Sequence, residues 1–129
     1  MNETPYSREY SPAAPVIQIK LAIPGEVPEA TSLTALVDTG ADGTFVPTAI
    51  LEEMELPIVY MTNVIPYLGD RPHRVSVHMV DFILNDTTRL PNIEVIADDW
   101  GENMILGRNI LNKLQLQLDG PNETTTLLA

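Results

Sequence analysis

Apolar and polar residues alternate along several short stretches of the chain, a pattern typical of half-buried β-strands. In the segment VIQIKLAI, at residues 16–23, isoleucine or leucine occupies every second position from Ile17 onward. The segment LTALV, at 33–37, is almost entirely apolar, which predicts a strand covered on both faces. Further strands are expected at residues 44–46, 58–65, 74–84, 92–97, 104–106, 114–118 and 124–128. Many short strands separated by turns predict an all-β, barrel-like fold.

Two segments have helical spacing instead. The first follows Pro47, a residue type that suits the first turn of a helix, and is expected to end near Leu56. Its apolar residues Ile50, Leu51 and Met54 share one helical face. The second is the segment GRNILNKL, which follows a short apolar run. The fold is therefore expected to carry one or two short helices.

The longest predicted strand, at residues 74–84, has apolar residues in two phases. Odd-numbered positions are apolar up to Met79, and even-numbered positions are apolar from Val80 onward. The change of phase between 79 and 80 predicts a bulge or a bend there. A turn at residues 67–72 contains Gly69 and joins this strand to the one before it. The two strands are therefore expected to form a hairpin that projects from the body.

Residues 1–14 differ in character from the rest of the chain. They are polar and contain Pro5 and Pro12, which predicts a flexible N-terminal arm. The chain has 129 residues, a length that fits one domain with one core. Residues 15–129 are therefore expected to form a single domain.

Charge and composition narrow the classes of partner. The chain has 18 acidic and 7 basic residues, a formal net charge of -11. Nucleic acid and anionic membranes would be repelled and are not expected as partners, although solubility alone also explains the charge. There is no cysteine, which excludes disulfides and thiol nucleophiles. No apolar run approaches the roughly 20 residues that span a bilayer, and no signal-peptide pattern is present, so the expected location is cytoplasmic.

The chemically informative segment is LVDTGAD, at residues 36–42. An apolar strand delivers Asp38 to the start of a tight loop, and a buried carboxylate is costly unless it has a function or partners. The alternative is a turn aspartate that accepts hydrogen bonds from nearby amides. A second motif, MILGRNIL at 104–111, places Gly107 after another apolar strand, 107 − 38 = 69 positions later.

These two motifs, in this order, resemble those of the retropepsin-like aspartic proteases, which are single-lobed. The resemblance covers roughly residues 16–119, and the C-terminal hairpin is more similar to bacterial members than to viral ones. It implies a closed, barrel-like acid-protease fold that forms a two-fold homodimer. It also implies an aspartic endopeptidase that acts on polypeptides without a cofactor or a metal. One Asp-Thr-Gly supplies one carboxylate, so Asp38 would pair with its copy in the partner chain.

The resemblance also assigns roles within the first motif. Asp38 would activate the attacking water together with its copy, and the Thr39 hydroxyl would bond across the dimer axis. Gly40 would let the substrate backbone approach closely, because it has no Cβ. Ala41 has no hydroxyl that could donate to the carboxylate. We therefore expect a weakly acidic activity optimum rather than a strongly acidic one.

The remaining site predictions also come from the resemblance. Asp42 would bind the substrate backbone and form an ion pair with Arg108, whose planar group suits a carboxylate. Leu68 and Gly69 would belong to a flap that closes over the substrate. Trp100 lies in the loop before the second motif and is expected either to line the substrate cleft or to fill a minor core.

Three further expectations remain open. A dimer of this fold could bind a peptide strand without cutting it, or could be a latent protease activated by dimerisation or by processing of the N-terminal arm. The histidines His73 and His78 have no partner pattern and are expected to be solvated. Asp98, Asp99 and Glu102 lack the spacing of a calcium loop, so no metal site is expected.

Overall fold

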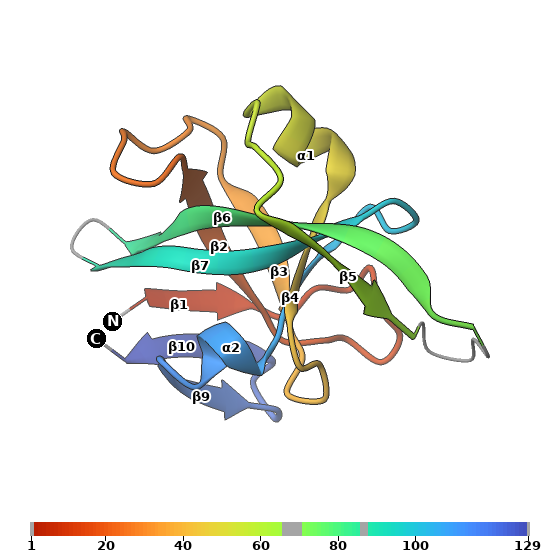
Figure 1. The fold of residues 1–129 in the computed structure, drawn as a ribbon. Helices are drawn as coiled ribbons and strands as arrows, with labels where there is room; N and C mark the ends of the chain where they lie inside the picture. Colours follow the sequence, from red (N-terminus) through yellow and green to blue (C-terminus); the bar gives the residue numbers. More distant parts are fainter. Residues whose placement is uncertain (1, 66–70, 86–87, 129) are drawn as a thin grey trace.

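The computed structural model describes residues 2–65, 71–85 and 88–128. Within this part of the chain, six strands form a closed barrel, because the first and last strands of the series also pair with each other (Figure 1). Around the barrel these strands are β2 (Val16–Ala22), β3 (Leu33–Val37), β8 (Met104–Leu106), β4 (Thr44–Pro47), β7 (Thr88–Asp98) and β6 (His73–Asn85). The predicted all-β, barrel-like fold is confirmed.

Aliphatic side chains fill the barrel interior. In β2, Ile17, Ile19 and Leu21 are at most 4% exposed, whereas Gln18 and Lys20 are exposed. This alternation follows from the two-residue period of a strand, which places successive side chains on opposite faces. Each fully buried aliphatic side chain stabilises the fold by about 1.5–3 kcal/mol relative to an exposed one.

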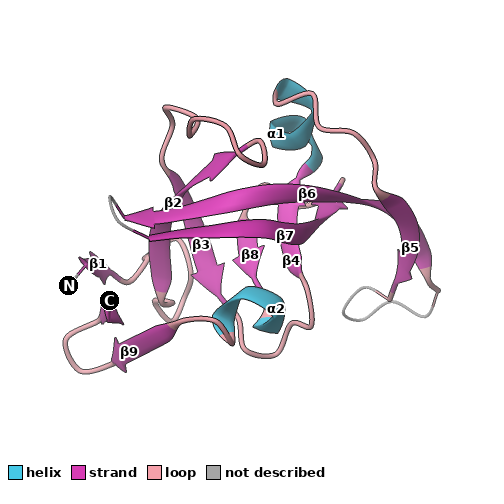
Figure 2. Cartoon of the chain, turned by 60° about the vertical axis from the view of Figure 1, so that its left-hand side comes forward, coloured by secondary structure: helices cyan, strands magenta, loops and turns pink. Residues whose placement is uncertain are grey.

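Two short helices lie at opposite ends of the barrel, α1 (Thr48–Glu53) and α2 (Arg108–Leu111) (Figures 1 and 2). Pro47 precedes α1 and has φ -52°, a value that proline favours and that suits a helix start. Ile110 and Leu111 of α2 are buried against the barrel. The prediction of one or two short helices is confirmed. Among the described residues, no helix has both the length and the apolar character needed to cross a membrane.

The hairpin of β5 (Tyr60–Val64) and β6 projects from the barrel (Figure 2). β5 pairs with β6 alone and forms the edge of the sheet in the described part of the chain. The predicted flap residues Leu68 and Gly69 lie outside the described residues. The position of the hairpin agrees with the expectation from the sequence.

The predicted bulge in β6 lies one or two residues later than expected. Pairing with β7 is continuous from Val77 to Val80, so the slip expected between 79 and 80 is wrong in position. The register shifts between Val80 and Phe82 instead. The two apolar phases have another cause: β6 is covered on both faces. Val80 and Phe82 face the core, whereas Val77 is buried on the other face.

At this bulge lies a buried carboxylate, Asp81, which is 2% exposed. It accepts hydrogen bonds from the amides of Gly25 (3.0 Å) and Asn92 (2.8 Å) and from Nε of Arg89 (2.9 Å). Asn92 has a positive φ of 55° and follows Pro91, which has no N–H for the ladder. The irregular ladder offers no backbone acceptor to the Asn92 amide, so the Asp81 carboxylate accepts its hydrogen bond instead.

His78 is also buried, at 7% exposure, which makes the expectation of a solvated side chain wrong. Its Nδ1 lies 3.0 Å from the carbonyl oxygen of Pro57, and its Nε2 lies 2.9 Å from Oγ of Ser76. These two polar partners explain how an imidazole is accommodated on the core side of β6. Ser76 lies two positions earlier on the same face of β6, whereas Pro57 is 21 positions away and could not be assigned from sequence spacing.

The two chain ends lie together in a separate three-stranded sheet, as Figures 1 and 2 show. β1 (Asn2–Pro5) pairs with β10 (Thr124–Leu128), which in turn pairs with β9 (Gln115–Asp119). The Arg8 guanidinium also contacts the Glu123 carboxylate at 2.6 Å. The structure thus differs from the expected flexible arm, because residues 2–5 form backbone hydrogen bonds with a strand distant in sequence.

Candidate active site

Asp38 follows the last residue of β3, beside the end of β8. These two strands are parallel, with Val37 opposite Leu106, so Asp38 and Gly107 leave the barrel at the same edge. The amide of Asp38 donates to the carbonyl oxygen of Leu106 at 3.1 Å. Two segments that are far apart in the sequence are therefore joined at the position of the carboxylate.

The loop after Asp38 turns back on the carboxylate. The Gly40 amide donates to Oδ1 of Asp38 at 2.9 Å, and the Ala41 amide donates to its carbonyl oxygen at 3.2 Å. Asp38 and Ala41 are partly buried, whereas Thr39 and Gly40 are exposed. The bond from Gly40 is the local contact that a turn aspartate also makes. In the single chain the carboxylate is open to a further partner.

Arg108 holds the outer side of this loop. Its Nη1 donates to the Thr39 carbonyl oxygen at 2.8 Å, and its Nη2 donates to Oδ1 of Asp42. Its amide donates to the carbonyl oxygen of Ala41 at 2.9 Å. The Asp42 side chain is 93% exposed, so its ion pair with Arg108 is a surface one. One arginine therefore contacts the loop at three residues.

Behind the loop, a buried network fixes the start of α2. The hydroxyl of Thr44, which is fully buried, accepts from the Gly107 amide at 3.1 Å and donates to Oδ1 of Asn109 at 2.7 Å. A Cβ at Gly107 would lie 2.0 Å from the Gly43 carbonyl oxygen. Glycine is therefore required at position 107 by the close approach of the two segments.

A row of apolar side chains extends across the barrel from the side of Asp38. Strand register places Leu36 opposite Ile105, Ile105 opposite Phe45, Phe45 opposite Ile96, and Ile96 opposite Val77. Opposite residues share a face, so these five side chains form one continuous apolar surface, in which Val77 is buried and the other four are partly exposed. Alternate residues of the same strands fill the core, so the row faces away from it. Because Asp38 is two positions beyond Leu36, it is in phase with this face.

Trp100 is exposed, at 62%, so the described chain does not bury it in a minor core. Its indole ring contacts the ring of His73 edge-on, with centroids 5.0 Å apart. His73 is exposed and is the first residue of β6, where it pairs with Val64 next to the turn of the projecting hairpin. The structure therefore places Trp100 beside the predicted flap.

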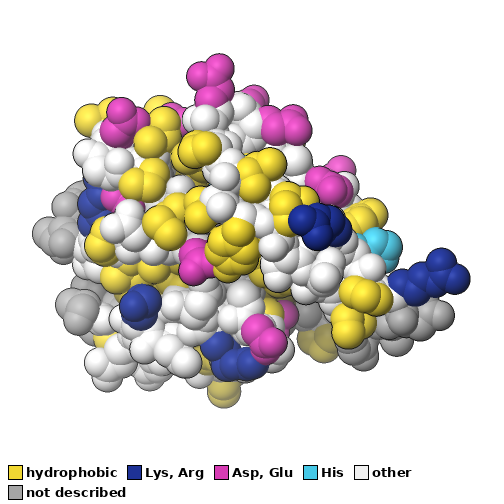
Figure 3. All heavy atoms as spheres, in the orientation of Figure 1, with side chains coloured by type: hydrophobic (Ala, Val, Ile, Leu, Met, Phe, Trp, Pro, Cys, Tyr) yellow, Lys and Arg dark blue, Asp and Glu magenta, His cyan; other side chains and the backbone are white. Residues whose placement is uncertain are grey.

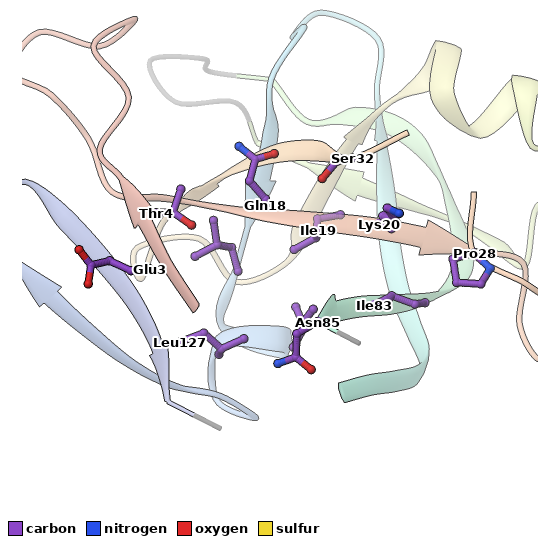
Figure 4. A pocket seen from close by; sticks show the side chains of 12 residues that line it. Glu3, Thr4, Gln18, Ile19, Lys20, Pro28, Ser32, Ile83, Asn85 and Leu127 are labelled. Carbon is purple, nitrogen blue, oxygen red and sulfur yellow. The ribbon is translucent and has the colours of Figure 1, made fainter. Parts of the chain in front are cut away.

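A cavity of about 610 Å³ lies elsewhere, between β1, β2 and the end of β6 (Figure 4). Gln18 and Lys20 of β2 line one side, and Glu3 and Leu127 come from the terminal sheet. No predicted site residue within the described chain lines it. Acidic side chains gather near α1 at the top of the space-filling view, also away from the Asp38 loop (Figure 3). Neither feature adds a group to the candidate site.

No protein-family model and no curated protein matches this chain. Solved structures do match. A retropepsin-like aspartic protease from Rickettsia conorii aligns with a TM-score of 0.61 and 13% identity, over 99% of this chain and 94% of that one. The protease of EIAV aligns with a TM-score of 0.54 and 20% identity, over 85% of this chain and 93% of that one.

The chain has the retropepsin-like fold. Simian foamy virus (mac) protease supports the same conclusion, with a TM-score of 0.53 and 22% identity over 75% of this chain and 91% of that one. At identities of 13% and 22% the likeness establishes the fold.

Two groups near this region, Tyr60 and Glu94, belong to no sequence motif. The hydroxyl of Tyr60 in β5 donates to the carboxylate of Glu94 in β7. The pKa of Tyr60 lies above its usual range because of this hydrogen bond, with smaller contributions from burial and from the negative charge of Glu94. The two residues are 34 positions apart, and only the pairing of both strands with β6 brings them together.

Proposed function

We propose that this chain is an aspartic endopeptidase whose active site forms at a homodimer interface. The main supporting observation is the position of Asp38, in phase with an apolar surface and on a loop held by α2. A carboxylate with open coordination beside an apolar floor suits an extended peptide with apolar side chains near the scissile bond. The retropepsin-like fold agrees with this assignment.

The mechanism requires two carboxylates, and each chain has one Asp-Thr-Gly. In the proposed dimer, Asp38 lies beside its copy, and the two share one proton because adjacent like charges do not both ionise easily. The ionised carboxylate removes a proton from a water held between them. The protonated carboxylate donates to the scissile carbonyl oxygen, and no covalent intermediate forms. Thr39, exposed at the start of the loop, would bond across the two-fold axis.

The substrate would lie between this loop and the β5–β6 hairpin. Gly40 is exposed and would admit the substrate backbone, and the open side of Asp42 would bind a backbone amide. Trp100, which contacts His73 near the turn of the hairpin, would line the cleft, and Leu68 and Gly69 would form the flap tip. Closure of such a hairpin over the substrate would exclude water from the reaction.

The decisive test compares the chain with its Asp38→Asn variant on a mixed peptide library between pH 4 and 7. The proposal predicts that the substitution lowers the cleavage rate by about 1,000-fold or more, because the general base is lost. Cut peptides are identified by mass spectrometry, and sedimentation reports the oligomeric state of both proteins. Glu29→Gln, which changes an exposed carboxylate in the 23–32 loop, is the matched control and should cleave normally.

Other outcomes separate the alternatives. Equal cleavage by both proteins would refute a catalytic role for Asp38. Dimers without cleavage would favour a peptide-binding module. A monomer without cleavage would favour latency, for which the pairing of β1 with β10 offers a structural basis, since β1 covers one edge of β10. In that case removal of residues 1–14 should produce a dimer that cleaves. An activity peak below about pH 3 would contradict the expectation based on Ala41.

A further inference from the structure

Glu94 lies in β7 on the same face as the apolar row. The register places Met79 opposite Glu94 and Val77 opposite Ile96, so Glu94 and Ile96 point to the same side. β7 runs antiparallel to β3. Glu94 lies two positions before Ile96 in β7, and Asp38 lies two positions after Leu36, just beyond the end of β3. Because the two strands run in opposite directions, both offsets point the same way. Glu94 is therefore displaced from the apolar row in the same direction as Asp38.

The backbone at Glu94 is tied to the loop that carries Asp38. Nδ2 of Asn109 donates to the Glu94 carbonyl oxygen at 3.0 Å, and Oδ1 of Asn109 accepts from the Thr44 hydroxyl at 2.7 Å. That hydroxyl also accepts from the Gly107 amide at 3.1 Å. These bonds keep the position of Glu94 fixed relative to the candidate catalytic loop.

Glu94 and its acidic neighbours Asp42 and Asp98 have different hydrogen-bond partners. Asp42 pairs with the Arg108 guanidinium, and Asp98 accepts from the amides of Trp100 (3.0 Å) and Gly101 (2.9 Å). Glu94 is exposed and accepts from the Tyr60 hydroxyl, which carries no charge. The contact orients this carboxylate without neutralising it.

The spacing of the strands relates Glu94 to the scissile bond. β3 and β7 are separated by β8 and β4, which makes three strand intervals. At about 4.8 Å per interval, Glu94 lies about 14 Å from Asp38 across the sheet. An extended peptide advances about 3.3–3.6 Å per residue, so this distance corresponds to about four residues.

We propose that Glu94, oriented by Tyr60, forms a subsite for a cationic substrate side chain about four residues from the scissile bond. The inference rests on the proposed endopeptidase function and adds a substrate class to it: peptides with a lysine or arginine flanking an apolar cut site. A two-fold dimer contains two copies of Glu94, so the preference applies on both sides of the cut. The net charge of -11 also favours cationic peptides over anionic ones in general.

The test uses peptides that share one cut site and carry lysine, norleucine or glutamate at a single position, moved from two to six residues away from the cut. Norleucine matches the lysine stem without its charge. We expect lysine to raise kcat/KM by about threefold to tenfold over norleucine, with a maximum near the fourth residue, and 1 M salt to reduce this ratio. Glutamate at that position should be the poorest substrate.

Three variants assign the effect. Glu94→Gln should abolish the lysine preference while norleucine peptides are still cleaved. Tyr60→Phe keeps the charge of Glu94, so the lysine preference should persist and fall by less than about twofold. Glu29→Gln causes the same change in net charge at an exposed residue of the 23–32 loop and should leave the preference intact. Equal loss in Glu94→Gln and Glu29→Gln would overturn the proposal in favour of a general charge effect.

A binding measurement separates this inference from the proposed function. Fluorescence anisotropy with labelled lysine and norleucine peptides is recorded on Asp38→Asn and on Asp38→Asn with Glu94→Gln. If the unmodified chain cleaves nothing but Asp38→Asn still prefers lysine through Glu94, the endopeptidase proposal fails and the cationic subsite stands. If cleavage depends on Asp38 but lysine has no preferred position, the subsite proposal is overturned and the protease remains.

Discussion

Asp38 and Asp81 are both supplied by barrel strands, but their surroundings are opposite. Asp81 is 2% exposed and receives hydrogen bonds from two backbone amides and from Arg89, with an ion pair of 2.8 Å. Asp38 is partly exposed, and among the described residues one hydrogen bond reaches its carboxylate, from Gly40. A carboxylate whose acceptor positions are filled stabilises the fold, whereas one with open positions can bind water, substrate or a second carboxylate.

The electrostatics of Asp81 agree with a structural role. Burial by itself raises the pKa of Asp81, but hydrogen bonds from the Gly25 and Asn92 amides and from Arg89, together with the Arg89 charge, outweigh it. The pKa of this carboxyl therefore lies below its usual range. The ionised form is the one that the fold stabilises, because all of these partners are donors.

The largest stability effect should come from Asp81→Asn. The substitution removes the negative charge opposite Arg89 and replaces one acceptor oxygen with a donor facing the same N–H groups. We expect the free energy of unfolding to fall by about 3 kcal/mol, as for other buried pairs that lose one partner. Urea denaturation measures the change. A loss below about 0.5 kcal/mol, the range of ordinary surface substitutions, would contradict a structural role for Asp81.

The contribution of Asp81 should also depend on pH. Since the folded pKa is lowered, the stabilisation is complete above the unfolded pKa of about 3.9 and is lost as pH falls through the folded value. The stability difference between the chain and Asp81→Asn should therefore be constant from about pH 5 to 7 and shrink below about pH 4. Unfolding curves at several pH values test this, and an unchanged difference at about pH 2.5 would refute it.

Arg108→Lys tests the loop that carries Asp38. Lysine has one compact charge and cannot donate to the Thr39 carbonyl oxygen and to Asp42 with the same planar geometry. The Asp42 pair is exposed, so the loss of unfolding free energy should be below about 1 kcal/mol. On the proposed function, kcat/KM should still fall by about 10- to 100-fold, because the loop positions Asp38. A variant with full activity would show that this arginine does not position the loop.

The smallest stability effect should come from Asp38→Asn. Its single hydrogen bond from Gly40 can be accepted by the Asn oxygen, so we expect a change within about 0.5 kcal/mol. The same urea experiment serves as the measurement, with Asp81→Asn as the reference. A loss as large as that of Asp81→Asn would assign Asp38 a structural role like that of Asp81.

Much of the candidate site could be predicted because it is local in sequence. The strand before Asp38, the tight loop through Gly40 and the glycine at 107 each appear as short motifs. Glu94 and Tyr60 could not be found in this way, since each is an ordinary residue of a strand. Their contact depends on which strands become neighbours, and pairing partners are chosen by packing of the whole sheet.

The sequence by itself determined the local elements: the alternation in β2, the helix start after Pro47, and the delivery of Asp38 by an apolar strand. Only the tertiary structure decided that β1 pairs with β10, that His78 is buried, and that Asp81 joins Gly25, Arg89 and Asn92. The physical reason is the range of the interactions. Side-chain periodicity acts over a few residues, whereas the donors around Asp81 come from positions 8 to 56 residues away and meet only in the closed barrel.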